Sequence, residues 1–140
     1  MPTSKTPYLC FGSMLHKLNA ISYHMRGDLG DPDMYKLADV GYDIAGKFDA
    51  GDSSVAFYRG MLHYNQRNFK LAQDHFARAI SLDSRNQKFY LGLAAASYYL
   101  GEVDRAYQNV KKAQDISPEN PDIIAVNSIV HASLGAFDRA

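Results

Sequence analysis

Apolar residues in the second half of this chain recur at intervals of three and four positions, which is the spacing of one face of an α-helix. Over 87–100 that face carries Tyr90, Leu93, Ala94, Ser97 and Tyr98. Over 103–116 it carries Val103, Ala106, Tyr107, Val110, Ala113 and Ile116. Gly101 separates the two segments and Pro118 follows the second, and both residue types end helices. The pattern therefore predicts two antiparallel helices of about 14 residues joined by a short turn.

This helix pair recurs along the chain with a period of 34 residues. Ala72, Ala106 and Ala140 close the related segments RNFKLA, GEVDRA and GAFDRA, and Ala38 lies one period earlier. A period of this length means that each repeat is one supersecondary unit, which cannot bury its apolar face alone. We therefore predict an all-α fold, a solenoid of stacked antiparallel helix pairs whose inner surface is free to bind another molecule.

Two further helices are predicted before the clear repeats. The first has Ser13 as its N-cap and Asp31-Pro32-Asp33 begins the second, which runs to about Phe48. The residues expected to face inward in the first helix are Met14, Leu18, Ile21 and Met25. Those expected to face inward in the second are Leu37, Ala38, Gly41, Ile44, Ala45 and Phe48.

The predicted elements divide the chain into five segments. Residues 1–10 are expected to be a flexible arm, and residues 11–52 are N-terminal helices that include a degenerate repeat. Residues 53–86 and 87–120 are two clear repeats, and residues 121–140 are an incomplete third.

The incomplete third repeat reaches only the start of a second helix, which is expected to begin after Gly135. The first-helix side chains left without a cover are then Ile123, Ile124, Ile129 and Leu134. Solenoids normally end with a polar-faced capping helix, and an uncovered apolar stripe marks an interface or an aggregation liability. Either the chain was cut from a longer protein, or another chain covers this end, which predicts a homodimer.

Charge and composition narrow the class of partner. Fifteen basic and fifteen acidic residues cancel, so the chain carries no electrostatic footprint for nucleic acid or an acidic membrane. Cys10 is the single cysteine, which excludes an internal disulfide and fits a reducing compartment. The chain contains no run of about 18 apolar residues, which is the length needed to span a bilayer. We therefore expect a cytoplasmic protein.

The two clear repeats resemble the tetratricopeptide repeat family. Gly60 and Ala94 stand at the small position of the first helix, Ala72 and Ala106 at that of the second, and Pro118 closes a repeat. This resemblance implies a right-handed superhelical solenoid in which the first helix of each repeat lines a concave, partner-binding face. It carries little information about function, because such repeats serve many unrelated partners.

A shorter segment resembles a narrower group. The sequence LDSRNQKFYLGLAAA at 82–96 is similar to a segment of the translocator chaperones of type III secretion systems. That resemblance implies a chaperone or adaptor that holds an aggregation-prone secretion substrate. Repeat proteins that assemble pili show a similar pattern, so a scaffold for a pilus or secretion machine remains the alternative. Residues 1–52 carry no matching motif, and Arg67 stands where the repeat family usually has glycine.

The family resemblance implies which side chains contact a partner. Carried over to this chain, they are Phe57, Met61, Tyr64, Asn65, Lys88, Leu91, Ala95, Tyr98, Tyr99, Ala125 and Ile129. Some family members bind a C-terminal carboxylate through a clamp of Lys, Arg and Asn. The clamp positions here hold Phe57, Met61, Gly92, Asp122 and Val126, with Lys88 the basic exception. The resemblance thus implies a protein or peptide partner with an apolar segment; for Tyr64 and Tyr98, packing between helices is the alternative role.

Catalytic and metal-binding motifs are absent from the sequence. It contains no His-Glu-x-x-His, no paired cysteines, no glycine-rich phosphate loop and no Gly-x-Ser-x-Gly. Asp28, Asp31 and Asp33 do not have the spacing of a calcium loop. The sequence therefore predicts a binding module, with no enzymatic role, metal or cofactor.

Overall fold

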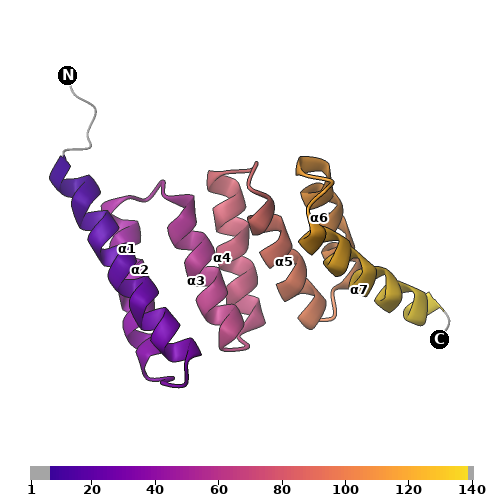
Figure 1. Cartoon of the computed structure of the whole chain (residues 1–140), viewed down its shortest axis with the longest axis horizontal. Helices are drawn as coiled ribbons and strands as arrows, with labels where there is room; N and C mark the ends of the chain where they lie inside the picture. The colour runs from indigo at the N-terminus through magenta and orange to yellow at the C-terminus, as the bar shows by residue number, and fades with distance from the viewer. Residues whose placement is uncertain (1–6, 139–140) are drawn as a thin grey trace.

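The computed structural model describes residues 7–138, with side chains over 12–129 and at 132, and folds them into seven α-helices (Figure 1). The helices are α1 (Pro7–Asp28), α2 (Met34–Phe48), α3 (Ser53–Asn65), α4 (Phe69–Leu82), α5 (Gln87–Tyr99), α6 (Val103–Ile116) and α7 (Pro121–Asp138). The predicted all-α fold is confirmed. The predicted helices over 87–100 and 103–116 agree with α5 and α6 to within one residue.

Successive helices form antiparallel pairs that stack side by side along the molecule (Figure 1). The first helices of the pairs contact one another in the order α1, α3, α5, α7. The second helices, α2, α4 and α6, make no such contacts with each other. The stack therefore curves toward the first helices, which we term the inner helices and which line the concave face.

Residues that are 34 positions apart occupy equivalent places in the core, and each helix pair has three such places along its second helix. The side chains on α2, α4 and α6 at these places are fully buried: Ala38, Ala72 and Ala106; Tyr42, Phe76 and Val110; Ala45, Ala79 and Ala113. Alanine at two of the places lets the helix axes approach closely, and the larger residue at the third fills the space between pairs.

Phe76 shows how tight this packing is. A Cβ atom added to Gly60 would lie 2.7 Å from Cδ1 of Phe76, and one added to Gly92 would lie 2.7 Å from its Cε1. The ring is therefore held between an inner helix of its own pair and the inner helix of the next. The prediction that position 60 needs a small residue is explained by this contact.

The turns that end α3 and α5 each use a residue with positive φ. Gly101 has φ 82° and Arg67 has φ 63°. In each turn the next N–H bonds back five residues, from Asn68 to the His63 carbonyl and from Glu102 to that of Ser97. Arg67 thus takes the conformation for which glycine is favoured, at the position where the family usually has glycine.

The predicted start of α1 is wrong. The helix begins at Pro7, so Ser13 lies inside it, and the Ser13 hydroxyl donates instead to the Ala45 carbonyl at 3.3 Å. Residues 7–10, assigned to the arm, are helical, and residues 1–6 lie outside the described residues.

The predicted inward face of α1 is also wrong. Met14, Leu18 and Met25 are 45%, 54% and 59% exposed, and among the four predicted residues Ile21 is partly buried. The face packed on α2 instead contains Ala20, which lies so close to Gly41 that an added Cβ there would be 2.8 Å from the Ala20 Cβ. The face that carries the small residues Ser13 and Ala20 packs inward because it permits this close approach.

In α2, Leu37 and Phe48 were expected to face inward but are 46% and 41% exposed. Tyr42, on another side of α2, is fully buried. A helix that packs mainly through a narrow stripe around Ala38 and Ala45 leaves the flanking positions open.

In α7, Ile123 was expected to be uncovered but is fully buried against Ala106, Val110 and Ala113 of α6. Ile124 and Ile129 are exposed, at 59% and 53%, and the Leu134 side chain lies outside the described side chains. The helix continues past Gly135 to Asp138, so the predicted turn and second helix are not formed over the described residues. After each earlier inner helix, a turn leads into a second helix that packs back on it. Within residues 121–138 no such second helix packs on α7.

Within the described range, no helix is both long and apolar enough to cross a bilayer.

Candidate functional site

A groove with a volume of about 340 Å³ opens between the inner helices α3 and α5, with α7 at one side. We call it the concave groove. Its lining residues are Phe57, Met61, Tyr64, Phe76, Lys88, Leu91, Gly92, Ala95 and Asp122. The lining is mainly apolar, with Lys88 and Asp122 as its two charged side chains.

Aromatic side chains pack against one another at the floor of the concave groove. The Phe57 ring centroid lies 5.8 Å from that of Phe76 and 5.2 Å from that of Phe89, in tilted arrangements. Met61 and Leu91 are half-buried beside these rings. A packed aromatic floor with an adaptable thioether beside it is suited to apolar side chains of varied shape.

A second cavity, with a volume of about 520 Å³, lies at the turn end of the inner helices. We call it the turn pocket. It is lined by Asp28, Tyr35, Tyr64, Asn65, Arg67, Phe69 and Tyr99. Tyr64 lines both cavities, and its ring meets those of Phe69 and Tyr99 edge-on at 5.5 and 5.9 Å. Phe69 and Tyr99 stack on each other at 4.8 Å, so one face of each ring is already covered.

The predicted contact residues fall into three groups. The concave groove contains six: Phe57, Met61, Tyr64, Lys88, Leu91 and Ala95. The turn pocket contains Tyr64, Asn65 and Tyr99. Tyr98 lines neither cavity and packs against the buried cluster around Ala94 and Val110. Ala125 and Ile129 are exposed on α7, outside both cavities.

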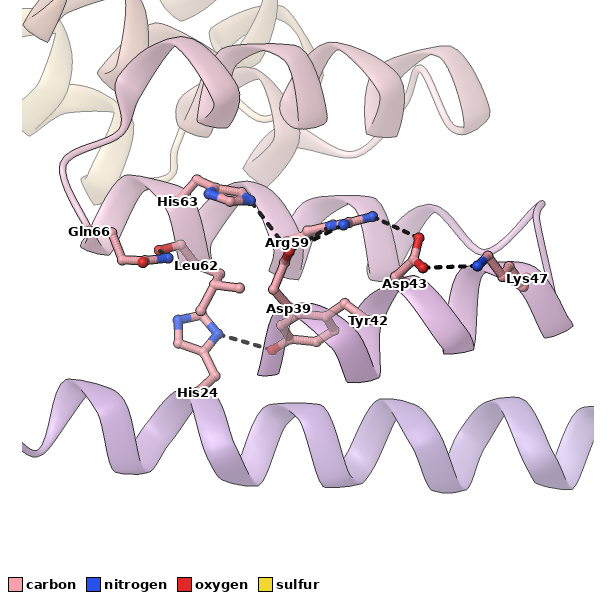
Figure 2. A network of polar contacts seen from close by, with 9 residues as sticks. All are labelled: His24, Asp39, Tyr42, Asp43, Lys47, Arg59, Leu62, His63 and Gln66. Carbon is pink, nitrogen blue, oxygen red and sulfur yellow. Dashed lines mark hydrogen bonds and ion pairs between the residues drawn. The ribbon is translucent and has the colours of Figure 1, made fainter. Parts of the chain in front are cut away.

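Asn65 has partners within the chain. Its amide nitrogen lies 3.0 Å from His24 Nε2 and donates to Asp28 Oδ1 at 3.0 Å. The other ring nitrogen of His24 lies 3.0 Å from the Tyr42 hydroxyl (Figure 2). Burial lowers the pKa of His24 despite the opposing effect of the Asp28 carboxylate, so the ring is neutral at pH 7. Asn65 therefore ties α3 to α1 at the edge of the turn pocket.

Another polar network lies on the side of α3 opposite Met61. Arg59 Nε donates to Asp39 Oδ1 at 2.8 Å and its Nη1 lies 3.4 Å from Asp43, which also pairs with Lys47 (Figure 2). His63 Nε2 lies 3.4 Å from Asp39, and together with the hydrogen bonds from Arg59 it holds the pKa of that carboxyl well below its usual range. These partners come from α2 and α3, about 20 positions apart in the sequence, so no local pattern could reveal them.

His63 also stacks on His75 of α4, with ring centroids 5.2 Å apart and planes within 9°. Burial lowers the pKa of His75 to about 4, and the positive Arg59 and the neighbouring His63 add to the shift. Two of the five histidines of the sequence are thus brought together. Over the residues whose placement is described, no group of three or more His, Cys, Asp or Glu could hold a metal ion.

Comparison with known proteins agrees with this architecture. The family model described as "Tetratricopeptide repeat" matches residues 53–86. The BBSome complex member BBS4 of Bos taurus is 27% identical over 106 residues, which cover 76% of this chain and 20% of that protein. The chain thus spans about a fifth of the length of this curated relative.

Two solved structures show how far the fold extends. The Sgt2 TPR domain from Aspergillus fumigatus superposes with a TM-score of 0.83 at 14% identity, over 100% of this chain and 89% of that one. The first TPR of Spaghetti (RPAP3), bound to the HSP90 peptide SRMEEVD, superposes with a TM-score of 0.81 at 17% identity, over 89% of this chain and 94% of that one. The chain therefore contains a tetratricopeptide repeat at residues 53–86 and has the fold of tetratricopeptide-repeat domains.

Proposed function

We propose that this chain is a non-catalytic protein-interaction module whose concave groove holds an apolar segment of a partner protein. The observation that carries the proposal is that six side chains at the contact positions of the repeat family line one mainly apolar groove. The RPAP3 domain that shares the fold binds a peptide of another protein, which supports the same general role.

The chemistry of the concave groove favours a different ligand from the one bound by that RPAP3 domain. The peptide SRMEEVD contains three acidic side chains. Lys88 is the single cation lining the concave groove, and Asp122 lines it as well. Carboxylates placed in an apolar groove without paired cations lose hydration that nothing replaces. An apolar or aromatic segment is the ligand that this lining supports.

The test is selection of binders from a phage-displayed library of random 12-residue peptides on the purified chain. We expect enrichment of peptides with several apolar or aromatic residues, and no measurable binding of SRMEEVD by fluorescence anisotropy. Leu91→Glu should weaken binding about tenfold or more, since burying one leucine contributes about 1.5–3 kcal/mol.

The matched control is Leu71→Glu, which places the same charge on the outer helix α4, where Leu71 is 41% exposed. Binding should survive this change. Equal binding by wild type and Leu91→Glu, or a preference for SRMEEVD, would overturn the proposal.

A second candidate is an assembly subunit, and two observations favour it. BBS4, a relative, is a member of a complex, and Ile124 and Ile129 are exposed on α7. The corresponding prediction is a homodimer through α7 that Ile129→Lys converts to a monomer in sedimentation velocity. A strict monomer at high concentration would contradict it.

The narrower resemblance to type III secretion chaperones rests on residues 82–96. The relatives reported above are proteins of other kinds. The proposed function therefore extends no further than the binding of an apolar segment of a partner protein.

A further inference from the structure

Four apolar side chains form an open row along α1, which we call the α1 stripe: Met14, Leu18, Ile21 and Met25. Three of them are about half exposed, at 45%, 54% and 59%, and Ile21 is partly buried. Their spacing of four, three and four residues keeps them on one narrow side of the helix. Such a row of exposed large side chains calls for an explanation.

The other contacts of α1 determine which way this stripe faces. Ser13 and Ala20 lie on the side that packs on α2. Lys17 and His24 lie on the side that meets α3, since Lys17 Nζ is 2.9 Å from Asp52 and His24 Nε2 is 3.0 Å from Asn65. Going around α1 from the side packed on α2, one first meets the side that contacts α3 and then the stripe. Because the inner helices line the concave face, the α1 stripe opens onto that face.

The repeat register relates the stripe to the concave groove. Tyr42 contacts His24 through its hydroxyl, and Phe76, one period later, packs its ring against Gly60. His24 and Gly60 are thus equivalent, with two extra residues in the turn between α1 and α2 accounting for the offset. By the same offset, the equivalents of Leu18, Ile21 and Met25 on α3 are Ser54, Phe57 and Met61. The stripe therefore repeats, on α1, two of the positions that line the concave groove on α3.

We propose that the occupant of the concave groove is an amphipathic α-helix of the partner protein, whose apolar face packs along the α1 stripe and against Phe57 and Met61. This inference rests on the proposed function and names the class of ligand. The stripe runs parallel to the α1 axis for about 16 Å, the rise of eleven helical residues. A partner helix inclined by about 20° packs along such a seam over its whole length. An extended segment that crosses the inner helices would touch only one or two of its members.

A second copy of the chain is the competing occupant, and the area available argues against it. Pairing of α1 with α1 would bury little more than one row of half-exposed side chains on each copy. Stable interfaces bury roughly 800 Å² on each partner. A helix seated on the concave face covers the stripe and the lining of the concave groove together, and it therefore buries more apolar surface.

The experiment compares two phage libraries selected on the purified full chain. One displays random linear 12-residue peptides, and the other displays 18-residue helical peptides in which only one face is randomised. We expect stronger enrichment from the helical library. Binding of its peptides, measured by fluorescence anisotropy, should weaken about tenfold or more in Leu18→Glu and in Met25→Glu, as in Leu91→Glu.

Asn19→Glu is the matched control, because Asn19 is exposed beside Leu18 but on another side of α1. It should bind like wild type, and circular dichroism should show all four variants folded, since each altered side chain is at least partly exposed.

The outcomes separate this inference from the function on which it rests. Binders that are lost in Leu91→Glu but retained in Leu18→Glu and Met25→Glu, or that come from the linear library alone, overturn the helix inference and leave the proposed function standing. Binders insensitive to Leu91→Glu overturn both. A wild-type dimer that Met25→Glu converts to a monomer in sedimentation velocity assigns the stripe to a second copy and also overturns the inference.

Discussion

The contact between Gly60, Phe76 and Gly92 allows a quantitative prediction for Gly60→Ala. The new Cβ would lie 2.7 Å from two ring atoms of Phe76, about 0.8 Å or more inside an ordinary carbon contact. The ring is fully buried and cannot retreat, because a Cβ at Gly92 on its other side would lie equally close. Overpacking of this kind costs about 1–3 kcal/mol, and the better helix propensity of alanine offsets about 1 kcal/mol. We expect a net loss of up to about 2 kcal/mol.

Gly46→Ala is the matched control for this prediction. Gly46 also lies within a helix, but a Cβ there would be 3.8 Å from its nearest neighbour, Val55 Cγ1. The same substitution should therefore stabilise the protein by up to about 1 kcal/mol through helix propensity alone. Urea unfolding followed by circular dichroism at 222 nm measures both variants, with the midpoint and the slope fitted separately.

A double-mutant cycle tests whether the ring is the cause. Phe76→Leu removes ring atoms, so Gly60→Ala should cost less in that background than in wild type, with a coupling energy above about 0.5 kcal/mol. The reasoning is refuted if Gly60→Ala stabilises the protein as Gly46→Ala does, or if the two changes at positions 60 and 76 are strictly additive.

Three further predictions concern stability. Burial lowers the pKa of His75 from 6.5 to about 4, and Arg59 and His63 add to the shift. Between those two pH values the unfolded chain therefore binds more protons than the folded one. The free energy of unfolding should accordingly fall as the pH drops from about 6.5 to 4. His75→Gln should flatten that slope in urea titrations at several pH values, and an unchanged slope would exclude His75 as its source. Arg67→Gly should raise the stability by up to about 1 kcal/mol in thermal melts, because φ is 63° at this position, whereas a loss would show that its side chain has a stabilising role. Gln73→Leu should cost about 1–3 kcal/mol in the same assay, because the buried amide donates to acceptors in α5 and the turn after it at 3.1 and 2.6 Å, and a neutral result would show those bonds to be dispensable.

Much of the fold was predictable because its signals are local. The spacing of apolar residues gives the ends of α5 and α6 to within a residue, and the repeated alanines identify the contacts between paired helices. Six of the nine residues that line the concave groove were named as contact residues from the resemblance to the repeat family. The backbone conformation of the turns was less predictable. Arg67 takes a left-handed conformation that is uncommon for its residue type.

The sequence by itself determined that this chain is a stack of helix pairs, because a period of 34 and a spacing of three and four are written in consecutive residues. Only the tertiary structure decided which face α1 buries. The face with Ala20 packs inward because Ala20 can approach Gly41 closely, and hydrophobicity alone does not predict that contact. It also decided that Asn65 binds His24 and that Arg59 binds Asp39. Such pairings depend on how neighbouring helices are placed in space, and a local sequence pattern does not predict which distant side chains will come into contact.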